Sequence, residues 1–454
     1  MTRTSIPSVI STFRPHQFLA IALLSCASLP VSAENLTDIY ALSRNNDPKF
    51  LAMRSEFEAT GFAVKEARAA LLPNVGFQYG RTNTSQNILS SDNAVFATGS
   101  ASYPTNDKTL SITQPIFRLA SWRNWKQSEA NEKQAAAAYA ASEQDLIVRT
   151  ATAYMAVLAA GDALAFARGE NESIKRQLDL ATTKYQNGQA IKANLYDAQA
   201  RNALKESDVI AAGNDLADKV QALREMTGAT TADLMPLPTS IRLTAPEPLN
   251  ADAWVTSALE KNLLLQARVQ AVDVARQEIE KRKAGYYPTV DLAISRNQRT
   301  TGGSLFGGGS SVNTNDVAVR LNIPIYEGGA TSAQTGQAVK HHDTALQDLE
   351  RDRRQVERQT RAAYQGVVSG MVRVRALDKS VIAFESARQL KEEGYKAGVS
   401  TILGVLDAER DLYAARRDAA QSRYDFQLNT LRLKQAAGTL AEGDLVQVGR
   451  AAAN

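Results

Sequence analysis

The sequence predicts a mainly α-helical protein with a small amount of membrane β-structure, built as an internal tandem repeat. Three observations predict this class: landmark residues recur about 210 residues apart, proline is missing from two long tracts, and segments of period two separate these tracts. A repeat of this length indicates two copies of a whole folding unit rather than a short solenoid repeat. The matching landmarks are Pro73 and Pro288, Pro115 and Pro324, Gly188 and Gly398, Asp197 and Asp407, and Gly228 and Gly438.

The repeat sets the expected domain boundaries. We expect a signal peptide at 1–33, a first repeat at 34–245, a second repeat at 246–444 and a C-terminal tail at 445–454. Arg3 and Arg14 precede an apolar segment, and the signal ends in Val31-Ser32-Ala33. Signal peptidase cleaves after small residues at this spacing, so the mature chain should start at Glu34.

The single cysteine, Cys26, leaves a second N-terminus open. It follows Leu23-Leu24-Ser25, and a cysteine in such a stretch could carry a lipid anchor. Leu24 is bulky for that motif, whereas Ala33 provides a better cleavage site. A chain cleaved at Ala33 contains no cysteine, which excludes disulfides and thiolate metal sites.

The proline-free tracts predict two long helical hairpins, at 118–227 and 328–437. No proline occurs between Pro115 and Pro236, or after Pro324. The arm that descends to Gly188 would reach roughly 110 Å at a rise of 1.5 Å per residue. Gly188 and Gly398 permit the left-handed turns at which the chain reverses.

Between the prolines of each copy the pattern changes to a period of two, which predicts strands. Each segment has about nine residues, the length at which a tilted strand crosses an outer membrane. A soluble four-stranded sheet is the alternative. Because four strands are too few to close a membrane barrel, a membrane sheet would require several chains. The expected strands are 74–82, 108–116, 289–297 and 315–323.

Several short motifs accompany the duplicated layout: Glu34-Asn35-Leu36, Asp47-Pro48, Glu393-Gly394-Tyr395, Val405-Leu406-Asp407-Ala408 and Leu412-Tyr413. With these motifs the chain resembles the TolC family of outer-membrane efflux and type I secretion channels. The resemblance implies a homotrimer whose four strands per protomer form a 12-stranded barrel in the outer membrane, above a long helical tunnel in the periplasm. Residues 34–47, 229–260 and 439–454 would form a belt around the tunnel.

The same resemblance implies a gate at the periplasmic end, closed by polar links between inner and outer helices. Tyr395 matches a lock tyrosine, while Asn194 replaces an aspartate and Ser400 replaces an arginine, so the charged lock is lost. Asp407 matches one of two aspartates that ring the entrance, and Gly404 occupies the position of the other. The alternative for Asn194 and Ser400 is helix capping, and an acid early in a helix, such as Asp407, is also favoured by the helix dipole.

The two expected turns resemble the grooves at which an adaptor protein docks in this family. Their residues are Asn187, Gly188 and Gln189 in the first copy, and Ala397, Gly398 and Val399 in the second. The plain interpretation is that they only reverse the chain, and both roles are compatible. The implied partners are a periplasmic adaptor, an inner-membrane transporter of the ABC or RND type, and outer-membrane lipid.

Other chemistry is not indicated. His341 and His342 are adjacent on a predicted helix, a spacing that does not favour a shared metal ion, and no cofactor motif is evident. Two of the 52 Lys and Arg residues belong to the signal peptide, which leaves 50 against 48 acidic residues and gives no reason to expect nucleic acid. We therefore expect a passive exit duct and not an enzyme. The alternatives are a coiled-coil scaffold without a pore and a lipid-anchored drug-efflux factor, and the sequence does not identify the cargo.

Overall fold

The computed structural model describes residues 34–90, 99–229, 233–237, 243–303 and 308–450. Both halves have the same order, two shorter helices, two strands and a long helical hairpin, which confirms the predicted class and internal repeat. The first half contains α1 (Leu36–Asn46), α2 (Pro48–Ala69), β1 (Asn74–Ile88), β2 (Gly99–Phe117), α3 (Leu119–Gln186) and α4 (Lys192–Thr227). The second half contains α5 (Ala251–Lys261), α6 (Leu263–Lys283), a 3-10 turn (Ala284–Tyr286), β3 (Thr289–Thr301), β4 (Ser310–Asn322), α7 (Ala330–Lys396) and α8 (Ile402–Ala436), followed by α9 (Gly443–Arg450).

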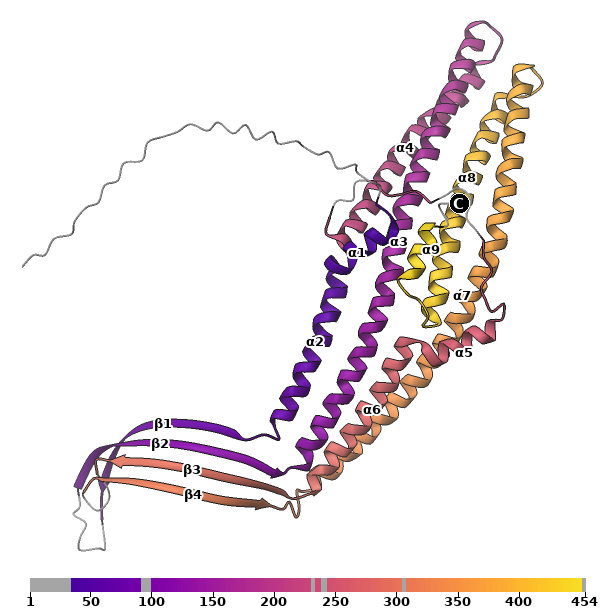
Figure 1. Cartoon of the computed structure of the whole chain (residues 1–454). Coiled ribbons are helices and arrows are strands. Elements are labelled where there is room, and N and C mark those ends of the chain that lie inside the picture. The colour runs from indigo at the N-terminus through magenta and orange to yellow at the C-terminus, as the bar shows by residue number, and fades with distance from the viewer. Residues whose placement is uncertain (1–33, 91–98, 230–232, 238–242, 304–307, 451–454) are drawn as a thin grey trace, which may run out of the picture.

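The molecule is elongated, with the sheet at one end and the two hairpin tips at the other (Figure 1). Helices α3 and α7 have 68 and 67 residues. At a rise of 1.5 Å per residue each is about 100 Å long. Composition and length alone would let α3 cross a membrane, but nearly half of its most apolar stretch is buried inside the chain. It is therefore a core helix, against which α4, α6 and α8 pack.

Helices α2 and α6 are not among the elements that prolines and glycines predict. Asp47 caps α2 by accepting a hydrogen bond from the Lys49 N–H at 2.9 Å, and Pro48 occupies the first helical position. Asn262 caps α6, and its side-chain amide also donates to the carbonyl of Ala436 at 2.9 Å. Each cap fixes the direction in which its helix leaves the belt toward the sheet.

The four strands form one antiparallel sheet in the order β1-β2-β3-β4. They have 15, 19, 13 and 13 residues, so the expected length of about nine is wrong. The additional residues, such as Ser85 and Asn87, lie toward the hairpin loops and are polar on both faces. A period of two in hydrophobicity therefore marks only part of each strand.

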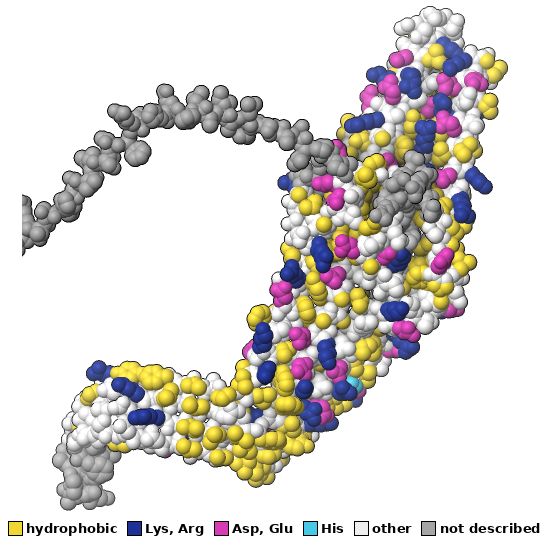
Figure 2. Space-filling model, in the orientation of Figure 1, with side chains coloured by type: hydrophobic (Ala, Val, Ile, Leu, Met, Phe, Trp, Pro, Cys, Tyr) yellow, Lys and Arg dark blue, Asp and Glu magenta, His cyan; other side chains and the backbone are white. Residues whose placement is uncertain are grey.

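The register gives the sheet two chemically different faces. One, the apolar face, carries large aliphatic and aromatic side chains in its half nearest the helices. The other, the polar face, carries small and polar side chains in the same half, with larger apolar side chains such as Tyr103 and Val312 only toward the hairpin loops. The apolar face includes Val75, Phe77, Leu110, Ile112, Leu292, Ile294, Val317, Val319 and Leu321; the polar face includes Gly76, Thr109, Ser111, Ser295, Asn297 and Thr314. In Figure 2 hydrophobic side chains cover the part of the sheet that adjoins the helices.

The largest apolar core lies midway along the helices, where α1, α3, α8 and α9 meet. Its fully buried side chains include Ile39, Leu146, Tyr154, Leu431 and Leu445. The Tyr154 hydroxyl donates to the carbonyl of Met235 at 2.6 Å, and burial raises its pKa to about 12, so it stays protonated at neutral pH. Glu34 pairs with Leu234 in a parallel bridge beside it. Tyr154 thus fastens the linker between the two repeats to the core.

Replacing Tyr154 with Phe should lower the free energy of unfolding of the helical region by about 1 kcal/mol, because the buried Tyr154 side chain loses its hydrogen bond to the Met235 carbonyl. Denaturant unfolding followed by circular dichroism measures this loss. Tyr413→Phe is the control, since burial also raises the pKa of Tyr413 but its hydroxyl has no hydrogen-bond partner among the described residues. Equal stability of Tyr154→Phe and the parent would contradict the anchoring role.

Candidate functional site at the hairpin tips

The two tips are built from the same turn. Gly188 and Gly398 adopt left-handed φ angles of 71° and 79°, as predicted. In each tip the residue after the glycine closes the turn, because the Gln189 N–H donates to the Lys184 carbonyl and the Val399 N–H donates to the Gly394 carbonyl, both at 2.8 Å. This bonding pattern satisfies the last carbonyls of a helix that ends in glycine. All six residues expected at the docking tip are exposed: Asn187, Gly188, Gln189, Ala397, Gly398 and Val399.

Tyr395, the expected lock tyrosine, lies where the α3–α4 hairpin contacts the α7–α8 hairpin. We call this contact surface the seam. Its side chain is 6% exposed and packs with Ile174 of α3 and with Val405 of α8. The ammonium of Lys184 lies 3.9 Å from the centre of its ring and 3.3 Å from its carbonyl oxygen. Among the described residues no hydrogen bond joins Tyr395 to Asn194. The cation–π contact with Lys184 therefore links α3 to α7 without Asn194.

The helix-capping alternative for Asn194 and Ser400 is wrong. Helix α8 is capped by Thr401, whose hydroxyl accepts from the Gly404 N–H at 3.1 Å, so Ser400 lies one residue outside the cap. Helix α4 starts after Ile191 and has no side-chain cap, so Asn194 already lies inside its first turn. Gly404 and Asp407 lie in the first two turns of α8.

Asp407, the expected entrance acid, is paired within its own chain. One carboxylate oxygen lies 2.8 Å from the guanidinium of Arg201 on α4 and 3.4 Å from that of Arg410 on α8. The Asp407 side chain is 39% exposed, so it borders solvent. In this arrangement its negative charge is compensated, and the pair with Arg201 links α4 to α8.

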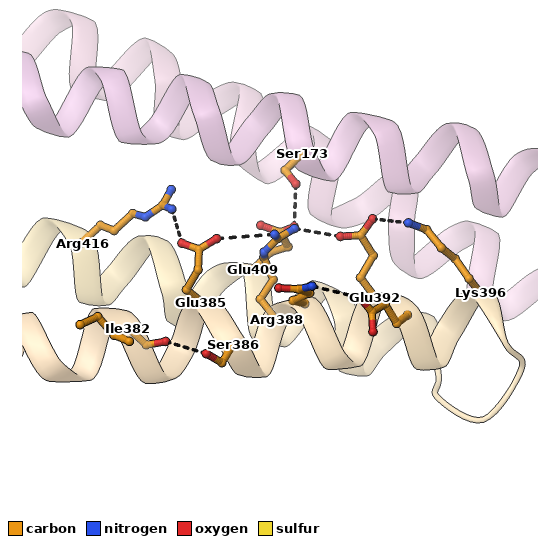
Figure 3. A network of polar contacts seen from close by, with 11 residues as sticks. Ser173, Ile382, Glu385, Ser386, Arg388, Glu392, Lys396, Glu409 and Arg416 are labelled. Carbon is orange, nitrogen blue, oxygen red and sulfur yellow. Dashed lines mark hydrogen bonds and ion pairs between the residues drawn. The ribbon is translucent and has the colours of Figure 1, made fainter.

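A second group of polar contacts joins α3, α7 and α8 close to the tips (Figure 3). Its centre is Glu409, which is 1% exposed and accepts a hydrogen bond from the Ser173 hydroxyl at 2.7 Å. Arg388 lies 3.5 Å from Glu409 and 2.8 Å from Glu392. The hydrogen bond from Lys396 holds the pKa of Glu392 below its ordinary value. Ser173 is the member that belongs to the first repeat.

Glu170 is a second buried carboxylate on the seam. It is 1% exposed on α3, and its oxygens lie 3.0 Å from Lys205 of α4 and 3.7 Å from Arg417 of α8. Removing one member of a buried ion pair leaves an uncompensated charge, so such groups favour one arrangement of the helices around them. The seam is therefore held by charges as well as by apolar packing.

Comparison with known proteins identifies the group to which this architecture belongs. The family model described as outer membrane efflux protein matches residues 39–229 and 254–439, which are the two repeats.

The chain belongs to the outer membrane efflux protein family.

Several relatives match this chain over most of their length. Outer membrane protein TolC of Vibrio cholerae is 34% identical over 94% of this chain and 96% of its own length, and TolC of Escherichia coli is 31% identical over 95% and 88%. The alkaline protease secretion protein AprF of Pseudomonas aeruginosa is 29% identical over 91% and 86%. Among solved structures, CusC has a TM-score of 0.75 at 16% identity over 89% of this chain and 92% of that chain. VceC of Vibrio cholerae has 0.74 at 17% over 89% and 96%.

These matches confirm the resemblance to the TolC family and the location in the outer membrane. The family model and the relatives named for the outer membrane and for protease secretion support an outer-membrane exit duct over the coiled-coil scaffold without a pore. The lipid anchor at Cys26 lies outside the described residues.

Lys184, Arg201 and the buried carboxylates Glu170 and Glu409 are not among the site residues that the sequence patterns predict. For Lys184 and Arg201 the repeat period itself provides a signal. Lys184 and Tyr395 are 211 residues apart, and Arg201 and Asp407 are 206 apart, both close to the repeat period. When two copies lie side by side, near-equivalent positions face each other. Charged or aromatic residues one period apart are therefore candidates for contacts across the seam.

Replacing Glu170 with Gln should loosen the seam by roughly 1–3 kcal/mol, because Lys205 and Arg417 lose a charged partner in a buried setting. Hydrogen exchange should become faster in the tip halves of α3 and α8. Glu172→Gln is the matched control, since Glu172 is 65% exposed and pairs only with Arg176 at 3.8 Å. Identical exchange in the two variants would show that Glu170 does not hold the seam.

Proposed function

We propose that this protein is the exit duct of a tripartite export system and conducts cargo passively from an inner-membrane transporter and an adaptor to the outside. The observation that carries the proposal is a two-faced sheet of four strands continuous with two helical hairpins about 100 Å long. Such a sheet can line a membrane pore, and such hairpins can extend the pore into the periplasm.

The number of strands supports a homotrimer. Single membrane barrels have about eight strands or more, so one chain cannot close a barrel. Three chains would supply twelve strands, with each polar face toward the lumen and each apolar face toward lipid. The free edges β1 and β4 would then pair between neighbouring chains, which satisfies their backbone groups in the bilayer.

We propose that the expected gate exists, but that Tyr395 and Asp407 have other partners than the sequence predicts. In each protomer Lys184 and Arg201 of the α3–α4 hairpin hold Tyr395 and Asp407 of the α7–α8 hairpin. Separation of the two hairpins would break both links and expose the Asp407 carboxylate at the entrance, beside Gly404. Asn194 and Ser400 remain candidates for contacts between protomers, for which a single chain gives no geometry.

The tip residues 187–189 and 397–399 are proposed as the docking site of the periplasmic adaptor. Their exposure and their position at the end farthest from the sheet support this role. Val399 is 85% exposed and Ile191 is 68% exposed, so each tip presents an apolar side chain that a partner could cover. An ABC or RND-type transporter would supply the energy, and the duct itself would need no catalysis.

The cargo class stays open between proteins and small molecules. AprF and PrtF are named for protease secretion, whereas TtgF is named as the outer membrane protein of a toluene efflux pump. AprF and PrtF are 29% and 27% identical to this chain, against 24% for TtgF, which favours protein export as one of its uses. For the lipid-anchored alternative, mass spectrometry of the mature N-terminus distinguishes Glu34 from an acylated Cys26.

The proposed duct is tested by purification from outer membranes and insertion into planar bilayers. We expect a trimer in mild detergent and discrete single-channel steps after insertion, because only a closed barrel conducts. A stable monomer, or a trimer that never conducts, would exclude the duct.

The proposed gate is tested with Arg201→Gln, which removes the link from α4 to Asp407. We expect a larger resting conductance and stronger preference for cations, because the freed carboxylates favour cations in the entrance. Arg410→Gln is the matched control, since Arg410 contacts Asp407 from the same helix. The charge exchange Arg201→Asp with Asp407→Arg should restore the closed state. Unchanged conductance in Arg201→Gln would remove this pair from the gate.

A further inference from the structure

The apolar face of the sheet ends, on three neighbouring strands, in a basic residue. Following each of these strands from the helices toward the hairpin loops, the side chains on this face are first apolar, apart from Gln114 on β2, and then positively charged. The basic residues are Arg81 on β1, Lys108 on β2 and Arg296 on β3. On β4 the corresponding position is Asn315. The residues that precede them are Val75, Phe77 and Tyr79 on β1, Ile112 and Leu110 on β2, and Leu292 and Ile294 on β3.

The register places these three side chains on one diagonal. Tyr79 is opposite Lys108, and Leu110 is opposite Arg296, so each step to the next strand moves the charge two residues toward the helices. With strands about 4.8 Å apart and two residues spanning about 6.8 Å, the diagonal slopes at about 55° to the hydrogen-bonding direction. Strands of membrane barrels tilt by roughly 35–45°. From β1 to β3 the boundary of the apolar residues is displaced toward the helices in the same direction as the diagonal. The diagonal therefore runs nearly parallel to the plane of the bilayer.

These cations have no acidic neighbours on their own face. All three residues are exposed, and among the described residues none pairs with a carboxylate. The described part of the apolar face carries no Asp or Glu, and the positions opposite them are Asn106, Tyr79, Gln298, Leu110 and Asn315. On the polar face, by contrast, Arg299 lies 3.7 Å from Asp107. In Figure 2 basic side chains gather on the sheet toward its loop end.

This position corresponds to the headgroups of the outer leaflet. The helices lie on the periplasmic side, so the loop end of the sheet faces outward, and the basic residues lie where the apolar face ends. The outer leaflet of an outer membrane is formed by glycolipids that carry phosphate groups on an acylated sugar. Guanidinium groups bind phosphate through paired hydrogen bonds, and the aliphatic and aromatic residues below can contact acyl chains.

We propose that Arg81, Lys108 and Arg296 form a binding surface for the phosphorylated headgroup of the outer-leaflet glycolipid. The proposal rests on the proposed barrel, since it requires the apolar face to meet lipid. In a trimer the surface would occur three times around the barrel. Its effect would be to hold a layer of glycolipid on the barrel at a fixed height.

The test is binding of purified bis-phosphorylated lipid A, against the same lipid without phosphates, to the trimer in nanodiscs of zwitterionic phospholipid. Wild type should prefer the phosphorylated form. The triple variant Arg81→Gln, Lys108→Gln, Arg296→Gln should lose about fivefold in affinity per residue and on the order of 100-fold in all, because each cation near an anionic headgroup contributes a similar increment. Inorganic phosphate should not displace the lipid, since it lacks acyl chains.

Arg299→Gln is the matched control, because Arg299 lies at a similar height on the opposite face. It should bind lipid A like wild type, and the variants on the apolar face should keep wild-type single-channel conductance, which separates this proposal from the duct itself. Should the triple variant fold poorly, Lys108→Gln alone provides the fivefold step. Equal affinity of the triple variant and wild type, equal loss in Arg299→Gln, no preference for phosphate, or displacement by inorganic phosphate would each overturn the proposal.

Discussion

In the interior of a bilayer no water is available to bind the N–H and C=O groups along the edge of a sheet, and each group left without a partner costs several kcal/mol. The four-stranded sheet of this chain has two such edges, β1 and β4. No other described element pairs with either edge, because apart from the sheet the described elements are helices that run away from it (Figure 1). The proposed trimer follows from this constraint. Closing the barrel in this way also decides which face of the sheet meets lipid and how close the helices of the three chains must lie.

At the opposite end the stability of the assembly depends on a seam inside each chain. Apolar packing there is modest, with Ile174, Tyr395, Ile402, Val405 and Leu406 in one small cluster. Two almost completely buried glutamates, Glu170 and Glu409, add contacts that are strong only while every partner is in place. A seam of this kind has two well-defined states, one with the hairpins in contact and one with the hairpins separated, and few intermediate arrangements. That property suits a gate better than a continuous apolar core would.

Much of the fold could be predicted because proline, glycine and periodicity act locally. Gly188 and Gly398 mark the turns, and their positive φ angles confirm that these turns use the left-handed backbone that glycine permits. Strand length could not be predicted, since residues such as Ser85 and Asn87 lie in strand but carry no alternation. The repeat period marks Arg201 and Asp407 only as candidates for a contact, because which residues pair depends on how far one hairpin is shifted along the other. A shift of one helical turn, about 5.4 Å, would pair different residues.

The matched turns at the two tips have an implication for symmetry. Their backbones are closed by the same hydrogen bonds, so three chains would present six turns of nearly identical shape. Their side chains differ, with Asn187 and Gln189 in one turn and Ala397 and Val399 in the other. The ring of tips would therefore be sixfold in shape and threefold in chemistry. A partner that contacts only the backbone could bind at all six places, whereas one that binds Val399 within the turn itself would bind at every second place.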